Sequence, residues 1–167
     1  AFAGIPIDVL MSFYMYCCSL GEAPFQSNNE VVSITTGTKA LQLFRSLAVL
    51  IDPANFNRNP IQVYEAMVNS NEIAYCPFAY GYSNYSRIGY SNKLLHFYDL
   101  VHLNEQPMIS SLGGTGLAVS SSSQHIQEAI QYAEFACSPT IQQTIYADNG
   151  GQPGHLQAWK NERINQL

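Results

Sequence analysis

The sequence predicts an α/β protein in which helices flank a small mixed sheet. Three observations support this fold class: apolar residues that repeat at helical spacing, short apolar runs between those repeats, and a composition suited to a packed core. Of the 167 residues, 47% are hydrophobic and only 11% are charged. A chain of this length and composition can bury a sizeable core. Segments that alternate between helical and strand patterns are typical of α/β folds.

Five segments have the spacing of an amphipathic helix. Asp52-Pro53 is expected to end the second, because proline cannot continue a helix, and Asn59-Pro60 supplies a cap and a first-turn proline for the third. Serines next to residue 123 are expected to cap the fourth. The expected helices are residues 7–20, 36–51, 60–69, 123–137 and 139–148.

Three short apolar runs are expected to form the strands of the sheet, at residues 72–76, 94–98 and 116–119. The last lies in the stretch 110–123, which joins a glycine-rich turn, a strand and a helix start. Gly113 and Gly114 in this stretch allow either a tight turn or a close approach of the backbone to a ligand.

Charge and composition exclude several classes of partner. The net charge is −5 and the seven Lys and Arg residues are not clustered, which argues against nucleic acid and against an anionic membrane surface. No apolar run is long enough to span a membrane, and the chain opens at Ala1, so we expect any signal peptide to be absent from this sequence. The four cysteines form no Cys-x-x-Cys pair and are expected to be buried small hydrophobic residues.

The segment 77–90 is the strongest candidate for a binding loop. Its aromatic residues alternate with Gly, Ser and Asn and have no helical or strand period. A tyrosine ring offers a flat apolar face and a polar tip, and a sugar ring needs both. We therefore expect at least one of Tyr80, Tyr82 and Tyr85 to contact a ligand, the alternative being that these rings fill the local core.

No pattern for catalysis or for a metal is complete. Ser83 lies in a segment that approaches a nucleophile elbow but has Tyr85 in place of the last glycine. Gly114 and Gly116 lack the third glycine of a dinucleotide-binding loop, and the four histidines have no metal-ligand spacing. The sequence therefore predicts no catalytic residue, no metal site and no cofactor, and the protein is not expected to be an enzyme.

An ordered series of motifs in the last third of the chain resembles a known family. The series begins with Ser-Leu-Gly-Gly-Thr-Gly-Leu-Ala-Val-Ser at 111–120 and continues with Ser138-Pro139, Gln142-Gln143, Tyr146, Asn-Gly-Gly-Gln-Pro at 149–153 and Trp159. It is similar to the C-terminal part of the extracellular solute-binding proteins of ABC importers, the family 1 type that mostly carries sugars. Because the resemblance covers the middle and later part of such a protein, most of the N-terminal lobe is expected to be missing.

The resemblance implies a fold and a division of the chain. The fold would be a periplasmic-binding-protein-like (type II) lobe. Residues 1–109 would form lobe two, and residues 110–167 a returning strand-helix-helix unit that packs on lobe one.

The resemblance also implies non-catalytic binding of a small polar solute, with a sugar as the favoured class, in a cleft between lobes. The partners would be ABC permease subunits, and the location extracytoplasmic, either in the periplasm or as a cell-surface lipoprotein. The ligand-binding residues would be Tyr80, Tyr82, Tyr85, Gly113 and Gly114. Two alternatives stay open: a glycoside-processing hydrolase or transferase that uses the same loops, and a sensor or adaptor domain of the same fold.

Overall fold

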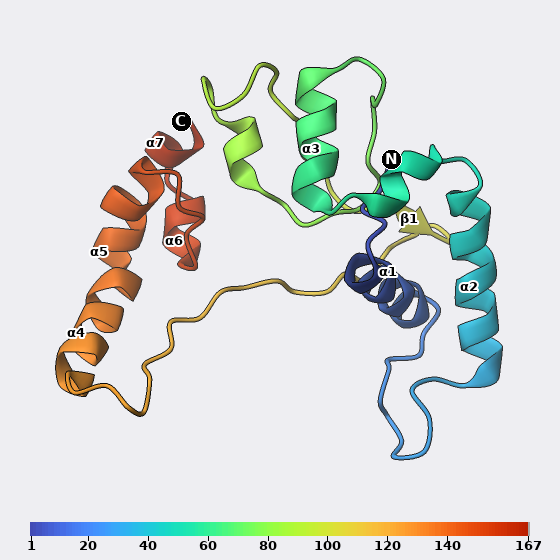
Figure 1. The fold of residues 1–167 in the computed structure, drawn as a ribbon, viewed down its shortest axis with the longest axis horizontal. Helices are drawn as coiled ribbons and strands as arrows, with labels where there is room; N and C mark the ends of the chain where they lie inside the picture. The colour runs from blue at the N-terminus through green and yellow to red at the C-terminus, as the bar shows by residue number, and fades with distance from the viewer. Residues whose placement is uncertain (167) are drawn as a thin grey trace. The chain divides into compact units, whose positions relative to one another are not determined.

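The structure is a computed structural model that describes residues 1–166, and its regular structure is almost entirely helical (Figure 1). Helix accounts for 47% of the chain and strand for 2%. The predicted α/β class, with a small mixed sheet and a periplasmic-binding-protein-like (type II) lobe, is therefore wrong. The elements are α1 (Pro6–Ser19), α2 (Ile34–Ala48), η1 (Pro53–Asn57), α3 (Pro60–Asn69), η2 (Ser83–Ser86), β1 (His102–Leu103), β2 (Gln106–Pro107), α4 (Ile126–Cys137), α5 (Pro139–Ile141), η3 (Gln142–Tyr146), α6 (Leu156–Trp159) and α7 (Glu162–Asn165).

The five predicted helices are present. α1, α2, α3 and α4 match the predicted ranges to within three residues at each end. The fifth begins as α5 and continues as the π-helical turn η3. Backbone hydrogen bonds in a π-helix join residues that are one position further apart than in an α-helix. Helical periodicity is a local property of the sequence, which is why these segments were found without knowledge of the fold.

Side chains at the helix starts explain where α2 and α3 begin. Asn59 accepts a hydrogen bond from the N–H of Gln62, and the Gln62 side chain accepts one from the N–H of Asn59, so the two form a capping box before α3. Ser33 caps α2 by accepting from the N–H of Thr36. Ser33 itself donates to the Glu22 carboxylate from its N–H and its hydroxyl, at 2.5 and 2.6 Å, which closes the loop between α1 and α2.

The start of α4 differs from the prediction. His125 occupies the cap position and its side chain makes no capping hydrogen bond. Ser123 instead accepts a hydrogen bond from the N–H of His125 at 3.1 Å and lies two residues before the cap position. The serine cap predicted for this helix is therefore wrong.

The strands predicted at 72–76, 94–98 and 116–119 do not form within the described residues. Several apolar side chains of these runs lie on the surface: Tyr75 is 62% exposed, Tyr98 89% and Leu117 57%. A strand requires a partner that supplies backbone N–H and C=O groups, and an apolar run does not specify that partner. The sheet was predicted from local patterns alone, and the pairing that it needed is absent from this part of the structure.

The strands that do form lie between residues 102 and 107, outside the three predicted runs. β1 and β2 are antiparallel, with His102 opposite Pro107 and Leu103 opposite Gln106. Asn104 and Glu105 join them with φ angles of 52° and 64°. Two successive left-handed residues are the geometry of a type I′ hairpin turn, whose twist suits two paired strands.

The chain divides into two compact units, and each contains two separate stretches of the sequence. The first unit consists of Ala1–Gly81 and Asn92–Leu112, and the second of Tyr82–Ser91 and the chain from Gly113 onward. The assignment of residues 1–109 and 110–167 to two lobes of a solute-binding protein stays a prediction.

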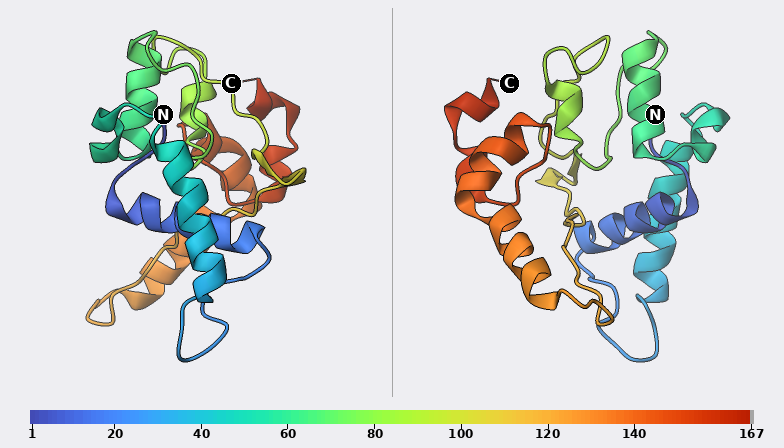
Figure 2. Two further views of the ribbon diagram at one scale, coloured as in Figure 1. Left: turned by 90° about the vertical axis from the view of Figure 1, so that its right-hand side faces the viewer. Right: turned by 60° about the vertical axis from the view of Figure 1, so that its left-hand side comes forward.

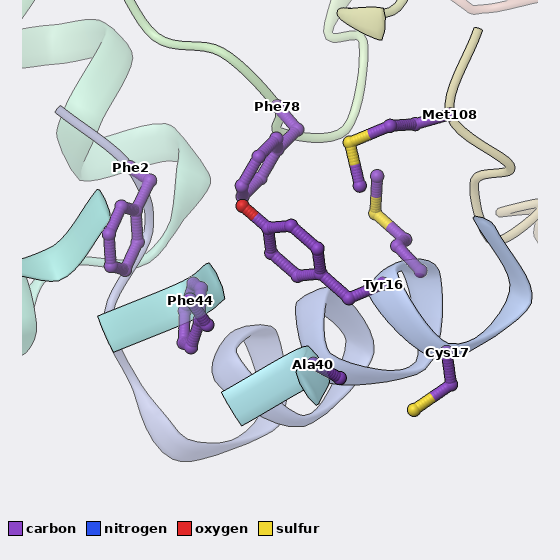
Figure 3. Packing of buried hydrophobic residues seen from close by; sticks show 8 residues of the cluster. Phe2, Tyr16, Cys17, Ala40, Phe44, Phe78 and Met108 are labelled. Carbon is purple, nitrogen blue, oxygen red and sulfur yellow. The ribbon is translucent and has the colours of Figure 1, made fainter. Parts of the chain in front are cut away.

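The core of the first unit forms where α1 packs across α2 (Figures 1 and 2). The rings of Phe2 and Phe44 lie 5.0 Å apart, and the Tyr16 ring lies 5.9 Å from Phe44 and 6.1 Å from Phe78. Figure 3 shows these rings packed in one cluster, with Met108 beside Phe78. Residues from both stretches of the unit therefore build one core. Its buried members are Phe2, Met15, Tyr16, Cys17, Ala40, Phe44, Phe78 and Met108.

The second unit is held together largely by side chains that bond to backbone. Arg87 donates to the carbonyls of Ala147 and Asp148 at 2.6 and 3.2 Å, which ties the stretch 82–91 to the turn after η3. The buried side chain of Gln142 donates to the carbonyl of Ala136 at 2.8 Å and accepts from the N–H of Gly154 at 2.8 Å. These bonds satisfy polar groups that would otherwise be costly to bury.

The cysteines only partly match the prediction that all four are buried. Cys17 is buried, Cys18 and Cys76 are half-buried, and Cys137 is exposed at the end of α4. Because sequence spacing does not show which face of α4 is covered, the exposure of Cys137 was missed. Burial raises the pKa of the Cys17 thiol, and the neighbouring Cys18 and Glu22 raise it further. Within residues 1–166, no helix combines the length and the apolar character needed to cross a membrane.

Candidate functional site

A small pocket opens in the first unit beside the first half of α1. α1 contributes one wall, the start of α3 and the segment 78–80 contribute another, and the chain on either side of the hairpin completes it. The space inside is about 40 Å³, which is enough for about three water-sized groups. The lining residues are Ala3, Asp8, Met11, Ser12, Met15, Pro60, Phe78, Ala79, Tyr80, Leu100, Ser110 and Ser111.

The sequence places one face of α1 along this pocket. Asp8, Met11, Ser12 and Met15 follow one another at the three- and four-residue intervals that share a helix face. Met15 also belongs to the hydrophobic core, so the floor of the pocket is continuous with packed apolar side chains. The helix therefore presents a carboxylate and a hydroxyl within an otherwise apolar wall.

Asp8 is the charged residue of the pocket. Its side chain is half-buried, yet its Oδ2 atom is cut off from solvent and has no hydrogen-bond partner among the described residues. Burial raises the pKa of the Asp8 carboxyl above its usual range, because the anion loses water without gaining a partner. A carboxylate left in this state costs free energy.

Of the residues predicted to bind a ligand, Tyr80 lines this pocket. The Tyr64 hydroxyl of α3 donates to the Tyr80 carbonyl at 2.7 Å, which fixes the backbone of the segment 78–80 against the helix. The Tyr80 side chain remains 36% exposed. A fixed backbone with a partly exposed ring is suited to contact with a ligand at the mouth of the pocket.

The other predicted ligand residues belong to the second unit. Tyr82 and Tyr85 lie in one turn, in which the N–H of Tyr85 donates to the Tyr82 carbonyl at 3.1 Å. Tyr82 is 37% exposed, whereas Tyr85 is 2% exposed and its ring meets that of Tyr90 edge-on at 5.3 Å. Ligand contact by Tyr82 or Tyr85 stays a prediction.

Gly113 and Gly114 lie in an exposed stretch with no helix or strand. Neither has a positive φ, and a Cβ atom added at Gly114 would have no neighbour within 4 Å. The backbone at Gly114 therefore needs no left-handed conformation, and no other part of the protein lies close enough to require a glycine there. A ligand contact at the two glycines stays a prediction.

The pocket has few polar groups. The groups that could act on a solute are one carboxylate, the hydroxyls of Ser12, Ser110 and Ser111, and the Tyr80 ring. Across residues 1–166, no group of three or more His, Cys, Asp and Glu side chains has the arrangement of a metal site. Arg87, which follows the tyrosines of the predicted binding loop, is engaged with the backbone carbonyls of Ala147 and Asp148.

Asp8 and Ser12 are the pocket residues that sequence reasoning missed. The segment 7–20 was identified as an amphipathic helix with an apolar face, and its polar residues were assigned no role. The available signal was position: Asp8 lies three residues before Met11 and seven before Met15, within the stripe that reaches the core. A carboxylate in an apolar stripe requires a partner, and none was evident nearby in the sequence.

Comparisons of the chain with protein-family models, with curated proteins and with solved structures give no match. The resemblance to ABC solute-binding proteins therefore rests on the sequence motifs described above.

Proposed function

We propose that this chain is a non-catalytic, extracytoplasmic binding component for a small polar solute, with a carbohydrate as the favoured class, that delivers its ligand to ABC permease subunits. The sequence motifs between residues 111 and 159 support the transporter role. The observation that supports solute binding is the pocket, whose lining combines Tyr80 and Asp8 with apolar side chains and serines. An apolar surface with few polar groups at defined positions is typical of small-molecule sites.

The dimensions of the pocket indicate how a sugar would bind. A space of about 40 Å³ is too small for a whole pyranose ring. One substituent of the ring would enter the pocket and meet Asp8 and the serine hydroxyls. The ring itself would lie across the mouth, with a C–H face against Tyr80, where apolar contact and hydrogen bonding act together.

The proposal is tested by replacing the tyrosine at the mouth. Tyr80→Ala should weaken carbohydrate binding about thirtyfold, because loss of one aromatic anchor typically costs on the order of 2 kcal/mol. Tyr98→Ala is the matched control, since Tyr98 lies in the same unit, is 89% exposed and does not line the pocket. Calorimetric titration against a panel of mono- and oligosaccharides measures both.

Two outcomes contradict the proposal. If no carbohydrate binds the parent protein, the favoured ligand class is wrong. If a glycoside is converted to products during the titration, the protein is an enzyme and the hydrolase alternative takes precedence.

A further inference from the structure

Along the described residues, the chain passes between the two compact units three times, after Gly81, after Ser91 and after Leu112. The first two passages enclose the stretch 82–91, which belongs to the second unit although the first unit continues on both sides of it. The third passage leads into the remainder of the second unit. The second unit is therefore built from two pieces of chain that are joined in sequence only through residues 92–112 of the first.

Arg87 holds the stretch 82–91 to the later piece of the second unit. Its guanidinium donates to the carbonyl oxygens of Ala147 and Asp148 at 2.6 and 3.2 Å. Hydrogen bonds with a charged donor are stronger than those between neutral groups, and the planar guanidinium can serve two acceptors at once. These bonds join residues 60 and 61 positions apart, so they depend on the fold of the unit and not on local chain geometry.

The stretch 82–91 is also packed against the later piece. A Cβ atom added at Gly150 would lie 3.2 Å from the Asn84 Oδ1 atom, so the two pieces of chain touch there. Tyr85 is 2% exposed, and a side chain buried to this degree touches about six or more other residues, which its neighbours in sequence do not supply alone. Arg87 is therefore one of several contacts that hold the two pieces together.

The third passage, in contrast, is exposed along its length. Every residue from 112 to 122 is exposed, and Leu112 is 100% exposed. Within the described part of the chain, residues 112–119 form no helix, strand or hydrogen bond. Ordered structure lies on both sides, since Met108 is buried in the core of the first unit and α4 begins at Ile126. Exposed segments of small and polar residues are preferred sites of cleavage by proteases.

The side chains of this segment indicate which proteases it suits. Residues 113–123 are Gly, Gly, Thr, Gly, Leu, Ala, Val and four Ser. Serine endoproteases select the residue before the cleaved bond by the shape of one pocket, which is small in elastase and contains a carboxylate in trypsin. The sequence has no Lys or Arg between Lys93 and Lys160, so the segment fits an elastase-type enzyme and offers trypsin no site.

We propose that residues 113–122 are a processing site for an elastase-type serine endoprotease, and that the cleaved chain persists as a complex of two fragments held by the stretch 82–91. In the cleavage step, water adds across the Ala118–Val119 peptide bond: the C–N bond breaks, Ala118 gains a carboxylate and Val119 an amine. The two passages that remain both lead into the stretch 82–91. The contacts of this stretch with the later piece would then become the interface between the fragments.

Limited digestion tests the processing site, with mass spectrometry to identify the products. In the parent protein, we expect the first elastase cut within residues 113–122. Ala118→Arg places a tryptic site in the exposed segment, and Gln131→Arg places one on an exposed position of α4 as the matched control with the same change in charge. Trypsin should cut the new site of Ala118→Arg at least about tenfold faster, because a helix must open locally before a protease can bind it.

A first elastase cut outside residues 113–122 would overturn the processing site. Equal tryptic rates at the two new sites would overturn it as well, because the segment would then be no more accessible than a helix.

Size-exclusion chromatography of the trypsin-cleaved Ala118→Arg protein tests the complex. The two fragments should elute together, and a synthetic peptide of residues 82–91 in excess should release them by competing for the carbonyls of Ala147 and Asp148 and the surface around them. The same peptide with Arg87→Ala should need at least about tenfold more for equal release, because it lacks the charged donor. This comparison does not require a variant of the protein at Arg87 to fold.

Three outcomes would overturn the role of the stretch 82–91. The first is separate elution of the fragments without any peptide. The second is equal release by the two peptides, which would mean that Arg87 contributes nothing to the interface. The third is a complex that neither peptide releases, because other contacts would then join the fragments.

Discussion

Asp8 illustrates how a single residue can be unfavourable for folding. Its Oδ2 atom has lost water without gaining a partner, which opposes folding of the ligand-free protein.

The first prediction concerns the pH dependence of stability. Because burial raises the pKa of the Asp8 carboxyl in the folded protein, the folded state holds this proton more tightly than the unfolded chain. The contribution of Asp8 is therefore most favourable below its unfolded pKa and is lost as pH rises through the folded pKa. Asp8→Asn should remove that loss and be at least as stable as the parent at neutral pH.

Urea unfolding across the acid to neutral range measures this effect for the parent, Asp8→Asn and Asp99→Asn. Asp99→Asn is the control, because Asp99 is exposed in the same unit. The difference between Asp8→Asn and the parent should grow with pH and should be absent for Asp99→Asn. A less stable Asp8→Asn at neutral pH would show that the carboxylate has a stabilising partner.

A second prediction separates a packed ring from a surface ring. Tyr85 is 2% exposed, so Tyr85→Ala should leave a cavity in the second unit. Loss of a large buried aromatic side chain costs about 3 kcal/mol or more, which lowers the melting temperature by about 6 °C or more for a chain of this size. Tyr132→Ala is the control, because Tyr132 is 65% exposed in the same unit. Thermal melts with similar losses for both variants would show that the Tyr85 ring is not packed in solution.

At the scale of single elements, α3 is the helix whose limits the sequence defines best. The Asn59-Pro60 pair and the apolar positions after it predicted residues 60–69, which are its observed bounds. The capping box with Gln62 accounts for this agreement, because its bonds join residues three apart and depend on no distant contact.

The cap also gives a third prediction. Asn59→Ala removes the acceptor for the N–H of Gln62 and should destabilise the protein by about 1 kcal/mol. Asn29→Ala in the exposed loop before α2 should change the free energy of unfolding by less than about 0.5 kcal/mol. Urea unfolding compares the two, and an Asn59→Ala variant as stable as Asn29→Ala would mean that the capping bonds contribute nothing net.

The residues of the pocket were partly predictable at this scale. Tyr80 was found because an aromatic residue in a segment without a period is typical of a binding loop, and it does line the pocket. Asp8 was not found, because its importance arises from residues more than fifty positions away that enclose it, such as Pro60, Phe78 and Leu100. A sequence pattern describes neighbours along the chain, whereas a pocket is made of neighbours in space.

At the scale of the whole molecule, the sheet was the main error. The runs at 72–76, 94–98 and 116–119 have the composition of buried strands. Their prediction as a sheet requires that this composition leads to burial and that the buried runs pair with one another. In the structure Tyr98 is 89% exposed and Leu117 57% exposed, so the step from composition to burial already fails. Composition limits which residues can be buried, but tertiary contacts decide which of them are.

The corrected fold class makes a fourth prediction. Far-ultraviolet circular dichroism should show a spectrum dominated by helix, in keeping with 47% helix and 2% strand. Infrared amide bands give a second measurement that is more sensitive to paired strands. A strong sheet band in the infrared spectrum would contradict the helical fold and return the α/β class to consideration.

The interleaving of the two units also has a consequence for synthesis on the ribosome. The core of the first unit includes Met108, so it cannot be completed when residue 81 emerges. By the time Met108 is available, the stretch 82–91 has been made, and Arg87 must wait for the carbonyls of Ala147 and Asp148. Domains that are contiguous in sequence fold in order as they leave the ribosome. In this chain the stretch 82–91 is synthesised well before the residues from Gly113 onward that complete its unit.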